Sequence, residues 1–246
     1  MSFLRSSVLG LAPVWLVCVA IVSLGCGTPA PQQAPQGLAS DPAVVTPGLT
    51  PAGHGGTAIV ILGDSLTAGL GLVTEEAFPA RLQELFWSEG YEEVEIVDAG
   101  VSGDTTAGGL RRVGSLLEPQ NVRILVVALG GNDALRGLSV GQTRQNLAGI
   151  IDAALAEGVD VLLTGMEGPT NLGEDYRTSF RDVFTSLAAQ YKGRISFVPF
   201  LLEGVAGNPS LNQPDGIHPN AQGARAIAEH LYQPLQNMVD ALPAAP

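Results

Sequence analysis

In the segment "LGDSL", a short apolar run ends at Leu62, where a strand is expected to end, and Gly63, Asp64 and a serine, Ser65, follow. A serine hydroxyl is a weak nucleophile that needs a base within hydrogen-bond reach. Of the three histidines, only His218 lies in a polar loop, "DGIHPN", where it follows Asp215 by three residues. A histidine base held by a carboxylate suits acyl transfer. We therefore expect Ser65, His218 and Asp215 to serve as nucleophile, base and orienting acid.

Acyl transfer also needs hydrogen-bond donors that stabilise the oxyanion of the tetrahedral intermediate. The candidates are the backbone N–H groups of Ser65 and Gly103 and the side-chain amide of Asn132, which follows a third apolar run in "LGGNDA". A glycine at position 103 permits a backbone conformation that other residues resist. We expect Asp104 to form a turn by accepting from its own backbone, and we leave the role of Asp64 open.

Five short apolar runs alternate with helical patterns in the chain and would position these groups. The expected strands cover residues 57–62, 94–98, 122–129, 159–164 and 195–198, and the helical patterns fall within 75–90, 105–120, 139–158, 174–193 and 221–239. This alternation predicts an α/β fold, a three-layer α/β/α sandwich with a five-stranded parallel sheet. In the flavodoxin-like order 2-1-3-4-5, the candidate residues would share one sheet edge. Gly158 and Gly193 are expected C-caps, and Asn220 an expected N-cap.

The first 26 residues have the pattern of an export signal, with one arginine followed by an apolar stretch. Their end, "SLGC", resembles a bacterial lipobox, which implies that Cys26 is lipidated, although a plain signal or a retained membrane helix is an alternative. We expect a Pro/Gly/Ala-rich linker over 27–56, a folded domain over 57–241 and a short tail over 242–246. This predicts a domain tethered to the cell envelope outside the cytoplasm, in the periplasm, at the outer membrane or at the cell surface.

Composition excludes several other classes of protein. The chain of 246 residues is 46% apolar, and its net charge of −12 argues against nucleic-acid binding and against electrostatic docking on anionic membranes. Both cysteines, Cys18 and Cys26, lie in the leader, so the rest of the chain has neither a disulfide nor a cysteine nucleophile.

Four blocks of the sequence resemble the SGNH, or GDSL, hydrolase family, in particular its bacterial acyl-CoA thioesterase, lysophospholipase and arylesterase group. The blocks are "ILGDSLTAGLGL", "VSGDTTAGGL", "LGGNDALRG" and "DGIHPNAQG". The resemblance extends from Thr57 to about Leu235 and implies an active serine esterase that is a monomer and requires no metal or cofactor.

The resemblance and the loop positions also suggest substrate-binding residues. Leu66 would begin the wall of an acyl pocket, and Leu135 lies in the loop 134–142 expected to continue it. The segment "EGPTNLGEDY" resembles the substrate loop of the group and contains Pro169 and Asn171, although Glu167 and Gly168 depart from the usual residues there.

Three functions compete at this point. The first is a membrane-tethered serine esterase that hydrolyses carboxylic esters or thioesters, with a small ester or a lysophospholipid as substrate. The second is a carbohydrate O-acetylesterase with the same catalytic residues, from which the first differs in the length of its pocket. The third is a non-catalytic envelope lipoprotein, which would fail to react with a serine-directed phosphonate.

Overall fold

A five-stranded parallel sheet forms the centre of the computed structural model, which describes residues 56–243. The strand order is β2-β1-β3-β4-β5, as the sequence predicted. The strands are β1 (Thr57–Gly63), β2 (Val94–Gly100), β3 (Val122–Ala128), β4 (Asp160–Thr164) and β5 (Ser196–Val198). The central strands β1 and β3 are apolar and almost wholly buried, because helices cover both faces of the sheet.

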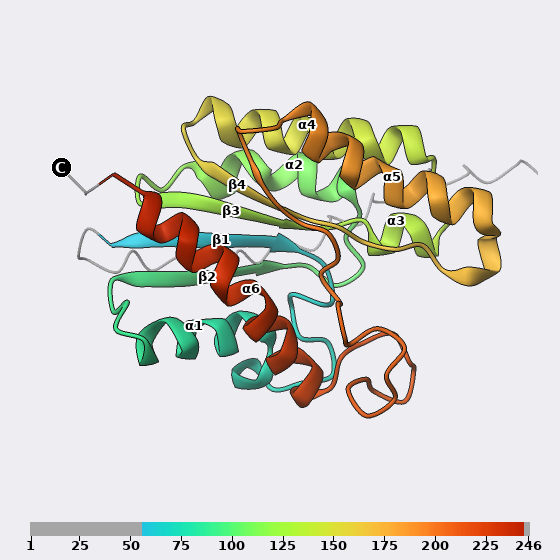
Figure 1. Cartoon of the computed structure of the whole chain (residues 1–246), viewed down its shortest axis with the longest axis horizontal. Coiled ribbons are helices and arrows are strands. Elements are labelled where there is room, and N and C mark those ends of the chain that lie inside the picture. Colours follow the sequence, from blue (N-terminus) through green and yellow to red (C-terminus); the bar gives the residue numbers. More distant parts are fainter. Residues whose placement is uncertain (1–55, 244–246) are drawn as a thin grey trace, which may run out of the picture. The chain divides into compact units, whose positions relative to one another are not determined.

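Helices lie on both faces of the sheet and complete the predicted three layers (Figure 1). On one face α1 packs against α6, and on the other α4 packs against both α2 and α5. The helices are α1 (Phe78–Ser88), α2 (Thr106–Leu117), α3 (Gly131–Leu135), α4 (Val140–Ala156), α5 (Glu174–Gln190) and α6 (Ala221–Ala241).

The short helix α3 is the main difference from the elements expected from sequence. The segment after β3 was expected to be a loop, but Gly130, with a φ of +120°, turns the chain directly into α3. A side chain at Gly130 would also crowd the ring of Phe184. The predicted loop 134–142 therefore contains the end of α3 and the start of α4, which Ser139 caps by accepting from the backbone N–H of Gln142.

The predicted caps fix where two of the long helices begin and end. Asn220 Oδ1 accepts from the backbone N–H groups of Gln222 and Gly223, at 3.0 Å each, so α6 begins at the expected residue. Gly158 follows the C-cap residue of α4 with a φ of +72°. Gly193 was also expected to be a C-cap, but α5 ends earlier: its C-cap residue is Tyr191, and Gly193 lies two residues beyond it with a φ of +78°.

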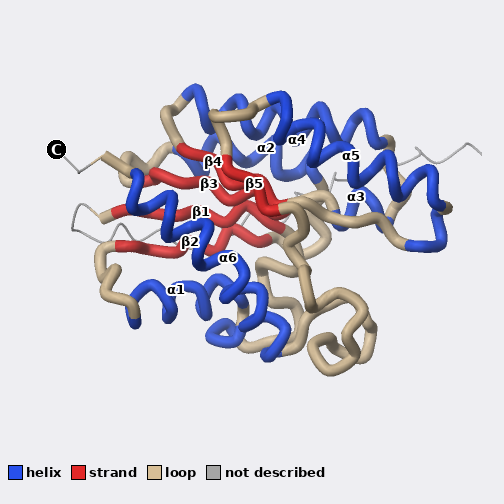
Figure 2. The backbone as a smooth tube through the Cα atoms, in the orientation of Figure 1, coloured by secondary structure: helices blue, strands red, loops and turns tan. Residues whose placement is uncertain are grey.

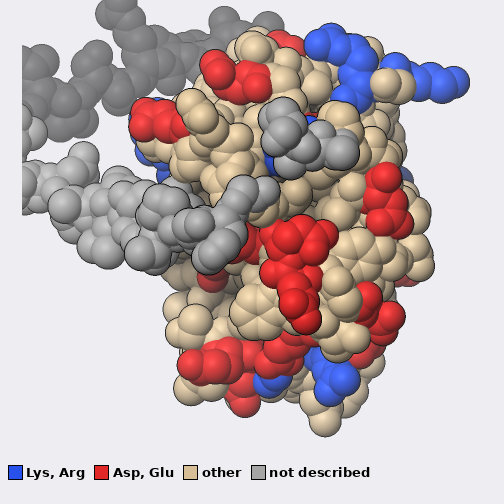
Figure 3. Space-filling model, turned by 90° about the vertical axis from the view of Figure 1, so that its left-hand side faces the viewer, with Lys and Arg blue, Asp and Glu red and all other residues tan. Residues whose placement is uncertain are grey.

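Long loops gather beyond the carboxyl ends of the strands (Figure 2). Acidic side chains spread over the other end of the molecule, where the strands begin (Figure 3).

Within residues 56–243, no helix combines the length and the apolar character needed to cross a membrane. The expected leader, linker and tail fall outside the described residues, apart from the last linker residue and the first two of the tail.

Candidate active site

Ser65 lies at the carboxyl end of β1 in a tight helical turn. Backbone N–H groups of Ala68 and Leu70 donate to the carbonyls of Asp64 and Ser65, both at 3.0 Å, and so curl the chain around the serine. A Cβ at Gly63 would overlap the side chain of Thr67, so this turn requires glycine there. The turn leaves Ser65 8% exposed.

The structure brings Ser65, His218 and Asp215 together in one hydrogen-bonded chain. Ser65 Oγ lies 3.0 Å from His218 Nε2, and His218 Nδ1 lies 2.7 Å from Asp215 Oδ2. Because an ionised carboxylate only accepts, Nδ1 carries the proton and Nε2 is free to accept from the serine hydroxyl. This is the arrangement that a serine nucleophile requires of its base.

Short-range hydrogen bonds hold Asp215 in place. Its Oδ1 accepts from the backbone N–H groups of Ile217 at 2.9 Å and His218 at 3.0 Å. These bonds, together with the side-chain bond from His218, lower the pKa of Asp215 to about 2. The backbone N–H of Gln213 closes the loop by donating to the carbonyl of His218 at 2.7 Å. With this pKa, the Asp215 carboxylate is ionised at neutral pH.

The three predicted oxyanion donors lie around the serine. Gly103 follows β2 with a φ of +81°, a conformation that favours glycine, and Arg136 Nη2 donates to its carbonyl at 2.8 Å. Asn132 lies in α3 after β3. Ser65, Gly103 and Asn132 line one cavity together with His218. The three candidate donors thus come from the segments that follow the neighbouring strands β1, β2 and β3.

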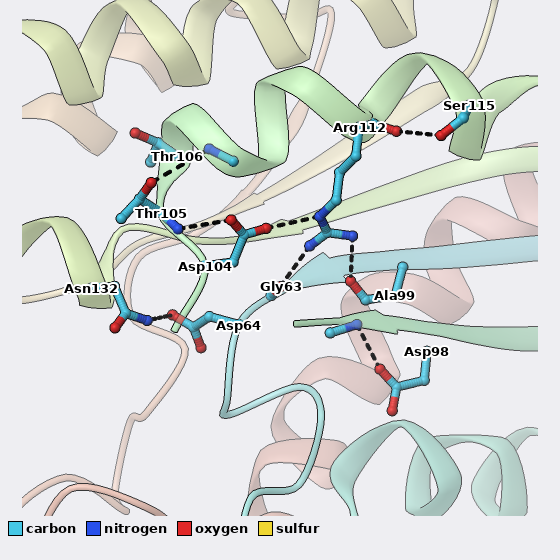
Figure 4. A network of polar contacts seen from close by, with 12 residues as sticks. Gly63, Asp64, Asp98, Ala99, Asp104, Thr105, Thr106, Arg112, Ser115 and Asn132 are labelled. Carbon is cyan, nitrogen blue, oxygen red and sulfur yellow. Dashed lines mark hydrogen bonds and ion pairs between the residues drawn. The ribbon is translucent and has the colours of Figure 1, made fainter. Parts of the chain in front are cut away.

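Asp64 has two partners, which settles the question left open by the sequence. Its Oδ1 accepts from the backbone N–H of Leu66 at 3.0 Å, a local turn contact. Its Oδ2 accepts from Asn132 Nδ2 at 3.2 Å, so the carboxylate also holds a candidate oxyanion donor (Figure 4). Burial raises the pKa of Asp64, and these two hydrogen bonds oppose that rise.

Asp133, beside Asn132, is a buried carboxylate that the sequence analysis missed. It accepts from the backbone N–H of Thr106 at 2.9 Å and from its hydroxyl at 2.6 Å. The hydroxyl of Thr143 donates to the same carboxylate at 3.2 Å. Asp133 therefore joins α3 to the start of α2 and to α4, which fixes the helix that carries Asn132. Its partners lie on two other helices, so no local pattern indicated them.

An apolar cavity of about 800 Å³ opens beside Ser65. Leu66, Leu135 and Pro169, the substrate-binding candidates from the sequence, line this cavity. Asn171, also a predicted substrate residue, lies in the short 3-10 helix Thr170–Leu172 and is exposed; the cavity wall includes Thr170 instead.

Several wall residues had no signal in the sequence, and they come from the segments after β4 and β5 and before His218. These are Met166, Phe200, Leu202 and Ile217. Arg177 of α5 also lines the cavity; its Nε donates to the carbonyl of Gly168 at 3.3 Å, and its Nη2 lies 3.6 Å from Glu167 Oε2. The unusual Glu167 thus helps to hold the wall segment against α5.

Comparisons with known proteins agree with this arrangement. Residues 61–226 match the family described as "GDSL-like Lipase/Acylhydrolase family". Over 181 residues the chain is 41% identical to "Esterase TesA" of Pseudomonas aeruginosa, covering 74% of this chain and 89% of the relative. It is 36% identical over 182 residues to "Thioesterase 1/protease 1/lysophospholipase L1" of Escherichia coli, covering 74% and 85%.

A solved structure gives the same result in three dimensions. The crystal structure of TesA superposes with a TM-score of 0.70 at 41% identity and covers 74% of this chain and 99% of that chain. The fold, the sequence blocks and the relatives therefore agree: the chain belongs to the GDSL-like lipase/acylhydrolase family, the SGNH hydrolases.

Proposed function

We propose that this GDSL-type esterase hydrolyses carboxylic esters and thioesters through an acyl-enzyme formed on Ser65. The hydrogen-bonded chain from Ser65 through His218 to Asp215, opening into an apolar cavity, is the observation that carries the proposal. The names of the relatives, which include esterase, thioesterase and lysophospholipase, support this class of substrate.

In the first half-reaction, Ser65 Oγ attacks the carbonyl carbon while His218 Nε2 takes its proton. Asp215 stabilises the imidazolium that forms. The oxyanion accepts from the backbone N–H groups of Ser65 and Gly103 and from the amide of Asn132. Asn132 Nδ2 carries two hydrogens, so its bond to Asp64 leaves one for the oxyanion.

The intermediate then collapses, and His218 gives its proton to the departing alkoxide or thiolate. A water molecule enters, His218 takes a proton from it, and the resulting hydroxide attacks the acyl carbon. The same three donors stabilise the second oxyanion. Collapse breaks the bond to Ser65 Oγ, which regains its proton from His218 and releases the carboxylic acid.

The dimensions and character of the cavity favour substrates with an acyl chain longer than acetyl. Leucine, methionine and phenylalanine side chains contribute to its wall, and the cavity extends from Ser65 to Phe200 and Leu202. An acetyl group on a sugar would leave most of this apolar surface without a partner, so we do not favour a carbohydrate O-acetylesterase.

A chain-length series tests the proposal. We would measure kcat/KM of the full chain on p-nitrophenyl esters from acetyl to palmitoyl, with Ser65→Ala as the blank. We expect a maximum at medium or long chains and no turnover by the variant. A maximum at acetyl with a steep decline would contradict the substrate class, and near-normal turnover by Ser65→Ala would contradict the mechanism.

We also propose that lipidated Cys26 tethers the domain to a membrane outside the cytoplasm. The sequence supports this proposal, because an apolar stretch over 8–24 leads into "SLGC", which ends at Cys26, and a Pro-rich linker follows. Metabolic labelling with an alkyne fatty acid tests it: Cys26→Ala should lose the label, whereas Cys18→Ala should keep it. A labelled Cys26→Ala protein would contradict the anchor.

A further inference from the structure

A partly buried guanidinium joins the carboxyl-terminal ends of β1 and β2, next to the candidate active site. Arg112 of α2 donates from Nη2 to the carbonyl of Gly63 at 2.8 Å and from Nη1 to the carbonyl of Ala99 at 2.7 Å. Its Nε donates to Asp104 Oδ2 at 2.8 Å (Figure 4). The side chains of Arg112 and Asp104 are only 14% and 11% exposed. All three bonds are charge-assisted, and water has little access to them.

The partners of this guanidinium are next to the reacting groups. Gly63 ends β1, two residues before the nucleophile Ser65, and Asp104 directly follows the oxyanion donor Gly103. The other carboxylate oxygen of Asp104 accepts from the backbone N–H of Thr105 at 3.0 Å, which is the turn contact expected from sequence. The ion pair with Arg112 is additional, and the sequence analysis missed it.

Arg112 does not touch the substrate space, because it is not among the described residues that line the cavity. Any effect on chemistry must therefore act through the two strand ends that it joins. We propose that Arg112, paired with Asp104, is a positioning residue that fixes Ser65 and the Gly103 amide relative to each other. This inference rests on the roles of Ser65 and Gly103 in the proposed function.

The rigid fork of the guanidinium explains why arginine suits this position. Its donors point in fixed directions and reach two backbone carbonyls and one carboxylate at once, whereas a lysine ammonium is a compact point charge. Catalytic groups displaced by about 1 Å can lose on the order of 10²-fold in rate. Arg112 thus holds a spacing on which oxyanion stabilisation depends, without contacting the oxyanion.

The first test compares Arg112→Met and Arg112→Lys with the wild type in ester hydrolysis. We expect Arg112→Met to lower kcat about 10- to 100-fold while KM changes less than about threefold, because the cavity is untouched. Arg112→Lys should have a kcat between those of Arg112→Met and the wild type, because lysine keeps the positive charge but lacks the rigid fork of donors. Arg111→Met, at the exposed neighbouring position on α2, should retain wild-type rates.

A second readout separates this inference from the proposed function. The rate at which a p-nitrophenyl phosphonate modifies Ser65, followed by release of one equivalent of p-nitrophenol, depends on the nucleophile and the oxyanion donors but not on the natural substrate. Arg112→Met should slow it by the same factor as kcat. If the wild type reacts with the phosphonate but hydrolyses no ester, the proposed function fails. The phosphonate rates of the wild type and Arg112→Met would then still decide the role of Arg112.

A stability control excludes a merely structural role. Val94 is buried at the opposite end of β2 from the site, so Val94→Ala weakens the same strand without touching the guanidinium. Its melting temperature should fall while its rates per folded molecule stay at the wild-type level. The inference is overturned if both rates of Arg112→Met lie within about twofold of the wild-type rates. It is also overturned if Val94→Ala, at the same loss of melting temperature as Arg112→Met, loses as much of its rate.

A second variant disturbs the same contact from the other side, should Arg112→Met fail to fold. A Cβ at Gly108 of α2 would overlap the carboxylate of Asp104, whereas one at Gly114 meets no atom of the described residues within 4 Å. Gly114→Ala should raise the melting temperature, as expected for alanine in a helix, and leave the rates unchanged. Gly108→Ala should slow both reactions. Equal rates in the two variants would overturn the inference.

Discussion

Ser65 and Asp64 are 8% and 2% exposed at the end of β1, whereas the side chains of His218 and Asp215 are 19% and 47% exposed on a loop. The nucleophile side is held by contacts between elements far apart in the sequence, including the bond from Asn132 to Asp64. The base side is held by hydrogen bonds within a few residues of the same loop. We therefore expect substitutions on the nucleophile side to lower both activity and stability, and substitutions on the base side to lower activity with little effect on stability.

His218→Ala should show this separation most strongly. Removal of the base leaves Ser65 without a proton acceptor, and kcat should fall on the order of 10⁵- to 10⁶-fold. The melting temperature should change little, because the hydrogen bonds that hold this loop are made mostly by backbone groups and by the Asp215 carboxylate, and not by the imidazole. Steady-state kinetics and a thermal melt measure both quantities. A large loss of stability would show that the loop is part of the folding core.

Asp215→Asn should give the next largest effect on activity. An asparagine cannot hold the imidazolium or select the tautomer, so kcat at neutral pH should fall about 10⁴-fold. The wild-type carboxylate has a pKa of about 2 and stays ionised at every pH of an ordinary activity profile. The acid limb of the wild-type profile should therefore not follow Asp215. An acid limb with its midpoint near pH 2 would show that the activity does follow Asp215, and would contradict this expectation.

Asn132→Ala should lose less activity but more stability than either loop variant. Loss of one oxyanion donor lowers kcat by about 10²- to 10³-fold, with a small change in KM. The change also leaves the buried Asp64 without one of its two hydrogen bonds, which should lower the melting temperature. Asn237→Ala, exposed on α6, provides the control. Unchanged stability in Asn132→Ala would break the proposed coupling.

The sequence predicted the sheet, its order and the residues that meet at its edge, because strand patterns and polar strand ends are local signals. The sequence missed the contact of Arg112 with Gly63 and that of Asp133 with Thr106, because the two partners are 49 and 27 residues away along the chain. Only the packing of α2 against the sheet decides that Arg112, and not Arg111, faces inward. The cavity wall at Phe200 was missed for the same reason, since no local pattern marks its orientation.

The smallest expected effect is the change of stability with pH. As the pH falls, the contribution of Asp64 to stability should rise, whereas that of Asp215 should fall. Burial raises the pKa of Asp64, so the folded chain binds its proton more tightly than the unfolded chain does. The wild type should therefore gain stability relative to Asp64→Asn as the pH falls from 7 towards 4. Hydrogen bonds lower the pKa of Asp215, so the wild type should lose stability relative to Asp215→Asn between about pH 4 and its pKa of about 2.

Melting temperatures of the three proteins at half-unit steps from pH 7 to pH 2.5 measure both differences. The Asp64→Asn series serves as the control for the Asp215→Asn series, since each variant removes one aspartate charge. The Asp215 difference should be the smaller one, because water screens a side chain that is 47% exposed. If the wild type instead lost stability relative to Asp64→Asn as the pH fell, the hydrogen bonds from Leu66 and Asn132 would outweigh burial. The contrast between a buried nucleophile side and an exposed base side would then not extend to their charges.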